Sequence, residues 1–434
     1  MESRRERVLK HFTDQADYMN ERISSGIEQH RKGRFSITVK DGEGNAVPGV
    51  KIVLHQKKHE FRFGANLFAL EEMETPEKTE AYKKLYARLF NMGTLPFYWK
   101  FVEPEKGKKR YAEGSPHIYR KPNIDVCLAF CEEYGIEPKA HCLDYDSFSP
   151  DWVKAMNNLG DIRTALYDRF EELSKMYADH VPSWEVTNET LNPPYSENTI
   201  HFQQPDTIEW DFHMADRLFP KNKLIINEAH NNLWPVFNGN RSTYYMLIER
   251  ALNKGCRIDS IGMQFHVCAT EENEQKLGAS MYSPERIYAV LDRYADFGKP
   301  IQITEISVPC YRNTEEDEDI QAEIIKNLYS IWFSHPAMEA IIYWDFVDGY
   351  EWTDNICGLV RKNLGPKKAY TVLDKLINET WRTDLEFATK DDGRISFKGF
   401  YGDYDVTISV GGKTVTKTVR LLKNAKPDFT ISIP

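Results

Sequence analysis

Short β-type runs alternate eight times with longer amphipathic runs between Phe61 and Trp381, and this alternation limits the possible folds more than any other feature. The β-type runs are FRFGANLF, MGTLPFYW, IEPKAHCL, SWEVTNE, KLIINE, IDSIGMQFH, IQITE and AIIYWDF. Helical patterns lie between them, over residues 77–90, 162–178, 244–253, 285–297 and 320–333. Repeated βα units favour a parallel sheet. Eight units without a Gly-rich phosphate turn predict a closed (β/α)8 TIM barrel over residues 61–381.

The flanks of this region alternate polar and apolar residues and carry Gly-rich turns, as antiparallel strands do. We expect residues 34–60 and 382–434 to form the two halves of one small accessory β-sandwich. Its D-G-x-G-x-x-V-P-G-V opening resembles the carboxypeptidase-regulatory or prealbumin-like type, with the barrel as an insertion. Residues 1–33 are expected to form an N-terminal helical segment, with one helix over Arg4–Ile27. The sandwich either binds carbohydrate or braces the barrel, and its G-F-Y-G-D-Y motif favours bracing.

Charge and cysteine content exclude several classes of protein. The net charge of −10 comes from interspersed acidic and basic residues, without the basic stripe that nucleic acid requires. No apolar run predicts a membrane span or a signal peptide, so we expect a cytoplasmic protein, or a secreted one if a leader was removed. Seven dispersed cysteines predict buried reduced thiols. Cys127 and Cys131 lack a second ligand pair, so neither a metal site nor a cofactor is predicted.

Two glutamates, Glu189 and Glu305, end two different predicted strands, where barrel enzymes carry their chemistry. Cleavage of a glycosidic bond needs one carboxyl to protonate the departing oxygen and a second to meet the oxocarbenium-like centre. A separation of about 5 Å gives retention of configuration, and about 6.5–9.5 Å gives inversion. Each glutamate alone could also be an exposed charge. Asn188, next to Glu189, can bond a sugar 2-OH, which favours the catalytic interpretation.

Histidines and tryptophans near other strand ends are candidate substrate contacts. His141 and His266 can bridge to a carboxylate, although a strand-end histidine is often only a hydrogen-bonded core residue. Trp344 and Trp352 offer flat apolar faces to a pyranose ring, or they pack in the core. Both interpretations stay open for these four residues at the level of sequence.

Together these motifs resemble glycoside hydrolase family 10, the xylanase family. The family's W-D-V-V-N-E, I-T-E-L, G-x-Q-x-H and tryptophan-rich motifs match residues 184–189, 303–306, 262–266 and 344–352, and G-H-T-L-V-W-H-S-Q-T-P-D-W is similar to residues 140–153. The resemblance implies an endo-β-1,4-xylanase that works by retaining double displacement without a cofactor, with Glu189 as acid/base and Glu305 as nucleophile. It also implies that a β-linked carbohydrate contacts Asn188, His141, His266, Gln264, Trp344, Trp352, Tyr145 and Trp99.

The chain departs from the family on the non-reducing side of the cleaved bond. Where the family has E-N-E-M-K-W, residues 94–99 read TLPFYW, so only Trp99 is kept. Each sugar hydroxyl that loses its partner costs about 1–3 kcal/mol, and Lys100 is the candidate substitute donor. Tyr145 stands for a tryptophan, and residues 227–228 read Asn-Glu for Asn-Asp. Two alternatives therefore stay open: an exo-acting or redirected β-glycosidase on short oligosaccharides or glycosylated small molecules, and a non-catalytic carbohydrate-binding protein.

Overall fold

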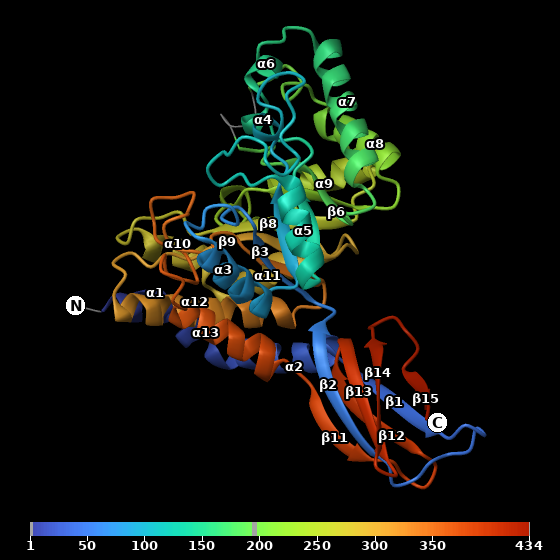
Figure 1. Cartoon of the computed structure of the whole chain (residues 1–434). Helices are drawn as coiled ribbons and strands as arrows, with labels where there is room; N and C mark the ends of the chain where they lie inside the picture. The colour runs from blue at the N-terminus through green and yellow to red at the C-terminus, as the bar shows by residue number, and fades with distance from the viewer. Residues whose placement is uncertain (1–2, 193–197, 434) are drawn as a thin grey trace.

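The computed structural model describes residues 3–192 and 198–433, and its central part is a closed barrel of eight parallel strands (Figure 1). In chain order the strands are β3 (Arg62–Asn66), β4 (Met92–Pro96), β5 (Glu137–His141), β6 (Ser183–Asn188), β7 (Lys223–Glu228), β8 (Ser260–His266), β9 (Ile301–Ser307) and β10 (Met338–Tyr343). β10 closes the ring against β3, with Ala340 opposite Arg62. The predicted TIM barrel is confirmed, and each predicted run overlaps one strand.

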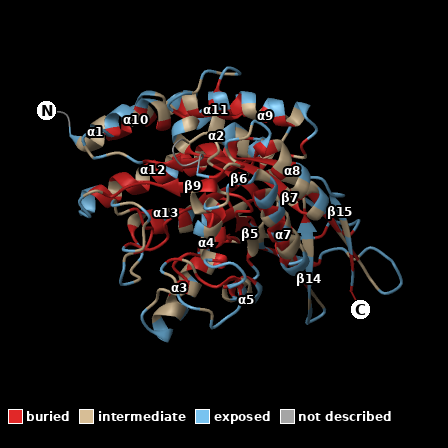
Figure 2. Cartoon of the chain, turned by 90° about the horizontal axis from the view of Figure 1, so that it is seen from above, coloured by how far each residue is buried: buried red, intermediate tan, exposed pale blue. Residues whose placement is uncertain are grey.

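Helices cover the outside of the barrel, and Figure 2 shows the buried strands at the centre of this ring. Those after β3 are α3 (Pro76–Leu89), α4 (Trp99–Val102), α5 (Ile124–Tyr134), α6 (Asp151–Lys154), α7 (Leu159–Tyr177), α8 (Thr207–Leu218), α9 (Thr243–Asn253), α10 (Glu274–Met281), α11 (Pro284–Ala295), α12 (Glu315–Ser334) and α13 (Lys368–Lys375), with short turns η1 (Asp146–Phe148), η2 (His230–Asn232) and η3 (Leu376–Thr380). α12 begins before its predicted range because the side chain of Thr314 caps Asp317 N. Across the described ranges, no helix has both the length and the apolar character that a bilayer crossing requires.

The barrel strands are buried along their whole length where they carry the candidate site. Every residue of β6, β8 and β9 is buried, which explains why these runs lack the polar alternation of a half-exposed strand. Side chains still alternate between the two faces of a strand. On β6, a bulge between Glu185 and Thr187 interrupts this alternation.

The N-terminal segment forms two helices, α1 (Arg4–Asp14) and α2 (Ala16–His30), rather than the single helix predicted over Arg4–Ile27. The break lies at Gln15, whose side chain accepts from Glu285 N at 2.9 Å and donates to Ser283 Oγ at 3.1 Å. Contacts with α11 therefore fix the break, and these are distant in sequence. Residues 1–2 of this segment lie outside the described residues, as does residue 434 of the C-terminal flank.

The two flanks pair with each other in two sheets (Figure 1). Their strands are β1 (Lys32–Lys40), β2 (Lys51–His59), β11 (Asp384–Ala388), β12 (Arg394–Phe400), β13 (Gly402–Val410), β14 (Lys413–Leu421) and β15 (Asp428–Ser432), in the orders β12-β1-β15 and β11-β2-β13-β14. Two aromatic residues of the G-F-Y-G-D-Y motif, Phe400 and Tyr404, are buried, and Tyr404 OH donates to Phe400 O at 2.6 Å. Both rings pack inside the molecule, which supports a bracing role.

Candidate active site

A cavity of about 940 Å³ lies at the C-terminal ends of the barrel strands, and both predicted catalytic glutamates line it. Glu189 directly follows β6, and Glu305 lies on β9. The other predicted residues that line this cavity are Asn188, His141, His266, Gln264, Trp344, Trp352 and Tyr145. The structure therefore brings together nine of the eleven side chains for which the sequence predicted a role in the site.

Glu189 is held by three hydrogen-bond donors. Tyr145 OH and Asn192 Nδ2 donate to its Oε2 at 2.7 and 3.1 Å, and Gln264 Nε2 donates to its Oε1 at 2.9 Å. Its backbone φ of 53° lies in the left-handed region that non-glycine residues rarely adopt. Such strain persists only where the surroundings fix it, and it is common at functional sites.

Glu305 is 4% exposed and has polar partners on both oxygens. Asn227 Nδ2 donates to its Oε1 at 3.1 Å, and His266 Nε2 lies 3.1 Å from its Oε2. Burial raises the pKa of Glu305 to about 8; nearby His141 opposes this rise, and Glu185 and Glu189 add to it. The two catalytic carboxyls together therefore hold a proton at neutral pH.

Side-chain amides connect the two glutamates. Asn188 Oδ1 accepts from Asn227 Nδ2 at 2.7 Å and from Gln264 Nε2 at 3.3 Å, and these two amides also bond Glu305 and Glu189. The Nδ2 atom of Asn188 is buried without a partner. Because a buried donor without an acceptor is costly, this atom is available for a sugar hydroxyl.

A polar chain runs from Glu305 away from the cavity. His266 Nδ1 lies 2.9 Å from Ser307 Oγ, which donates to Asp345 Oδ2 at 3.1 Å. Burial lowers the pKa of His266 to about 3, so the imidazole is neutral. With Ser307 donating to Asp345, its oxygen accepts from His266 Nδ1, and His266 Nε2 then accepts from a protonated Glu305. This tautomer agrees with the raised pKa of Glu305.

A buried ion pair that the sequence analysis missed supports the floor of the site. Glu185 on β6 bonds Lys139 and His141 on β5, and all three side chains are at most 1% exposed. Although burial acts to raise the pKa of Glu185, Lys139 and His141 hold it below its ordinary value. A charged residue within an otherwise apolar strand was the signal that could have identified this pair.

The two predicted tryptophans have different environments. Trp344 is 4% exposed, and its ring centre lies 5.1 Å from that of His141 and 5.1 Å from that of Phe68. Trp352 is 46% exposed and lies 4.9 Å from the ring of His266. Trp344 is therefore packed into the wall of the cavity, whereas Trp352 has an exposed aromatic surface.

The predictions for Trp99 and Lys100 are wrong, because neither residue lines the cavity. Helix α4 begins at Trp99, directly after the cavity-lining Tyr98. Trp99 Nε1 donates to Glu103 at 2.9 Å, and Lys100 pairs with Asp151 at 2.9 Å on the surface. Residues that the sequence analysis did not identify line this end of the cavity: Phe68, Tyr98, Arg120, Lys121 and Phe148. The prediction of buried cysteines is also wrong for Cys268, which is exposed and lines the cavity.

Among the residues that the structure describes, two buried groups have donor atoms close enough together to contact one metal ion. They are His141, Glu185 and Glu305, and Asp144, His201 and Asp211. In the first group, Lys139 already supplies the positive charge that a metal would bring. In the second group, His201 Nε2 lies 3.0 Å from Asp211 Oδ1, so a hydrogen bond already links two of the three side chains.

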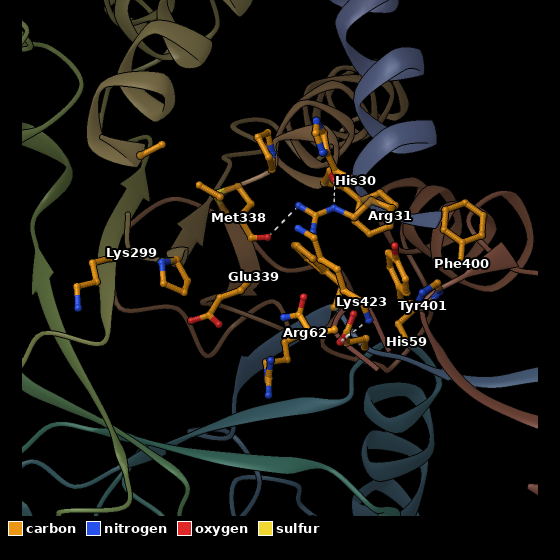
Figure 3. A pocket seen from close by; sticks show the side chains of 18 of the residues that line it. His30, Arg31, His59, Arg62, Lys299, Met338, Glu339, Phe400, Tyr401 and Lys423 are labelled. Carbon is orange, nitrogen blue, oxygen red and sulfur yellow. Dashed lines mark hydrogen bonds between the residues drawn. The ribbon is translucent and has the colours of Figure 1, made fainter. Parts of the chain in front are cut away.

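A second cavity, of about 540 Å³, lies at the opposite ends of the strands, beside α2 and the sandwich (Figure 3). Arg31 lies at its centre and donates to the carbonyl oxygens of His335 and Met338 at 2.5 and 2.8 Å. These bonds tie α2 to the segment that enters β10. Neither Glu189 nor Glu305 lines this cavity.

Known proteins share both the sequence pattern and the fold. The model of glycosyl hydrolase family 10 matches residues 55–375. Anti-sigma-I factor RsgI6 of Acetivibrio thermocellus is 25% identical over 400 residues, which are 92% of this chain and 47% of that protein. The Endo-1,4-beta-xylanase 5-like protein of Arabidopsis thaliana is 25% identical over 401 residues, 88% of this chain and 63% of that protein. The chain thus spans about half to three fifths of the length of these relatives.

Among solved structures, xylanase 10B of Thermotoga petrophila RKU-1 in complex with xylobiose has a TM-score of 0.59 at 21% identity. The match covers 74% of this chain and 95% of that one, and it shows a common barrel fold. The region matched by the family model includes both strands that position the glutamates. The chain therefore belongs to glycoside hydrolase family 10.

Proposed function

We propose that the chain is a retaining glycoside hydrolase that cleaves β-1,4-linked xylan or xylo-oligosaccharides. One observation carries the proposal: Glu189, directly after β6, and Glu305, on β9, line one cavity and are connected by side-chain amides. This arrangement leaves Asn188 Nδ2 without a partner and so free for a sugar hydroxyl. Family membership supports the retaining chemistry. The names of the plant and Thermotoga relatives support xylan as the substrate.

The proposed reaction has two displacements. Glu305 attacks the anomeric carbon, and the bond to the departing sugar breaks as Glu189 protonates its oxygen. Water then attacks the same carbon, gives its proton to Glu189 and releases Glu305. Tyr145 and Gln264 orient Glu189 throughout, and Asn227 stabilises the charge on Glu305.

The proton held by the two carboxyls has to lie on Glu189 when the substrate reacts. In the free protein, burial favours protonated Glu305. A bound sugar that develops positive charge beside Glu305 favours the ionised form of that carboxyl. Substrate binding therefore moves the proton toward Glu189, the position required for acid catalysis.

A second candidate, an exo-acting or redirected β-glycosidase, is favoured by the aromatic wall on the glycone side. Tyr98 lies 4.5 Å from Phe148 and 5.7 Å from Phe68 between ring centres. These apolar faces replace family residues that bond sugar hydroxyls. A long neutral glycone therefore finds few hydrogen-bond partners here. A short glycone has fewer hydroxyls and so loses fewer hydrogen bonds.

The product profile tests the proposal. Purified protein is incubated with β-1,4-xylan and linear xylo-oligosaccharides, and proton NMR follows the anomer first released. A ladder of short products with retained β configuration supports the endo-acting xylanase, and release of xylose alone supports the exo-acting candidate. Initial release of the α anomer contradicts the double displacement. Binding of oligosaccharide without turnover of any aryl β-glycoside supports a non-catalytic protein.

A further inference from the structure

Two cations that follow each other in the chain, Arg120 and Lys121, line the catalytic cavity. The Nζ atom of Lys121 lies 4.8, 4.9 and 5.2 Å from the ring centres of Phe68, Tyr98 and Phe101. It donates to Arg120 O at 3.2 Å. Burial lowers the pKa of Lys121 to about 7, and the charge of Arg120 lowers it further. An ammonium group has three donors, and the bond to Arg120 O uses only one of them. The negative charge of nearby Glu72 offsets the fall in the pKa of Lys121 only in part.

Arg120 also has too few hydrogen-bond acceptors and too little negative charge around it. It is 7% exposed, its Nη2 donates to Asp345 Oδ1 at 3.2 Å, and its buried Nε has no partner. Burial raises the pKa of Asp345 to about 7, so this carboxyl neutralises Arg120 only in part. The nearby Glu72 bonds the backbone N of Arg120 at 2.7 Å and His117 at 3.0 Å, and it does not line the cavity.

These cations lie on the glycone side of the reaction centre. The ring of Tyr98, beneath Lys121, lies 4.9 Å from the ring of His141. Arg120 connects through Asp345 and Ser307 to His266, the partner of Glu305. Tyr98 belongs to the segment in which the family's polar glycone contacts are missing. The cations therefore replace those contacts with positive charge.

We infer that the cavity selects a glycone sugar that carries a carboxylate, as a uronic acid does, and that Lys121 and Arg120 bind this group. A carboxylate accepts charge-assisted bonds from both cations, and the faces of Phe68 and Tyr98 pack against the ring of the sugar. A neutral glycone offers only hydroxyls to the same donors. The inference rests on the proposed function, because it concerns the substrate of the same cavity.

The test measures binding separately from turnover. Calorimetry with the full chain carrying Glu305→Gln compares xylotriose with xylotriose that bears glucuronic acid on its non-reducing xylose. We expect the acidic ligand to bind about 10-fold more tightly or better. Adding Lys121→Met should reduce this preference to less than about 3-fold, because the acidic ligand loses more affinity than xylotriose does, and Lys121→Arg should retain the preference. Lys100→Met, outside the cavity, is the matched control and should leave the preference unchanged.

Equal affinity for the two ligands overturns the inference, and so does an equal loss of both with Lys121→Met. A sulfated xylotriose that binds as tightly as the glucuronic acid ligand overturns the assignment of a carboxylate, because the site then takes any anion. Wild-type turnover of aryl β-xylosides is measured in parallel. Absence of this turnover contradicts the proposed function. The binding preference of the Glu305→Gln protein is measured without turnover, so the two proposals can fail independently.

Discussion

The two sides of the catalytic cavity are built differently. On one side, Glu189 and Glu305 are positioned by buried strands, and their oxygens contact polar side chains of the site. On the other, Arg120 and Lys121 come from the connection between β4 and α5, and Arg120 keeps a buried donor without a partner. The proposed reaction thus depends on the barrel strands, whereas the proposed selection of the substrate depends on the connection. Specificity can therefore differ between family members while the chemistry is kept.

The largest effect is expected from Glu305→Gln, on the side of the cavity that the barrel strands form. We call this the strand-borne side, and we call the side with Arg120 and Lys121 the loop-borne side. The variant should lose on the order of 10⁴-fold or more in kcat on every β-glycoside, because an amide is too weak a nucleophile to form the glycosyl intermediate. Turnover of xylan and of an aryl β-xyloside measures the loss, with thermal unfolding as the control for folding. A variant within tenfold of wild type would remove Glu305 from the mechanism.

Glu189→Ala should affect substrates with a poor leaving group far more than substrates with a good one. On xylan, whose leaving group needs a proton, we expect a loss of about 10²–10⁴-fold. On an activated aryl glycoside, the first step should proceed near its normal rate and appear as a burst of released phenol, because a good leaving group needs little acid help. Rapid-mixing kinetics on both substrates measure this difference. Equal losses would contradict the assignment of Glu189 as the acid.

The pH profile should report the proton that the two carboxyls hold. Because the pKa of Glu305 is raised to about 8, this proton is present below that pH and is lost above it. We expect kcat/KM on xylo-oligosaccharides to fall about tenfold per pH unit above about pH 8. An activated aryl glycoside should lack this alkaline limb in its first step, since ionised Glu305 still attacks. The same alkaline fall in rate on both substrates would show that the fall does not come from loss of this proton.

The sequence was most informative about the strand-borne side, because its signals are local. A β-type run ends in Glu189, another in Glu305, and the side chains alternate between two faces. The other side depends on contacts between distant residues. Lys100 pairs with Asp151 outside the cavity, and Glu72 bonds the backbone of Arg120 from another connection. Periodicity and spacing carry no record of such contacts.

Tyr98→Phe should give a smaller effect and probe the loop-borne side. Its ring packing against Phe148 and His141 is kept, and only a cavity-lining hydroxyl is removed. Loss of one neutral hydrogen bond to a glycone should raise KM about 3–10-fold on xylotetraose, with kcat little changed. An aryl β-xyloside, which lacks the extended glycone, should show no such rise. A fall in kcat on both substrates would instead place Tyr98 with the catalytic groups.

The smallest effect is expected from Lys100→Met, which tests where the loop-borne side ends. Lys100 pairs with Asp151 at 2.9 Å on the surface, and solvent screens such a pair. We expect kcat/KM on xylo-oligosaccharides to change by less than about twofold, and Asp151→Asn should match it because both variants break the same ion pair. A tenfold loss confined to Lys100→Met would show that its ammonium swings into the cavity when substrate binds. Lys100 would then supply the glycone contact that the structure assigns to Arg120 and Lys121.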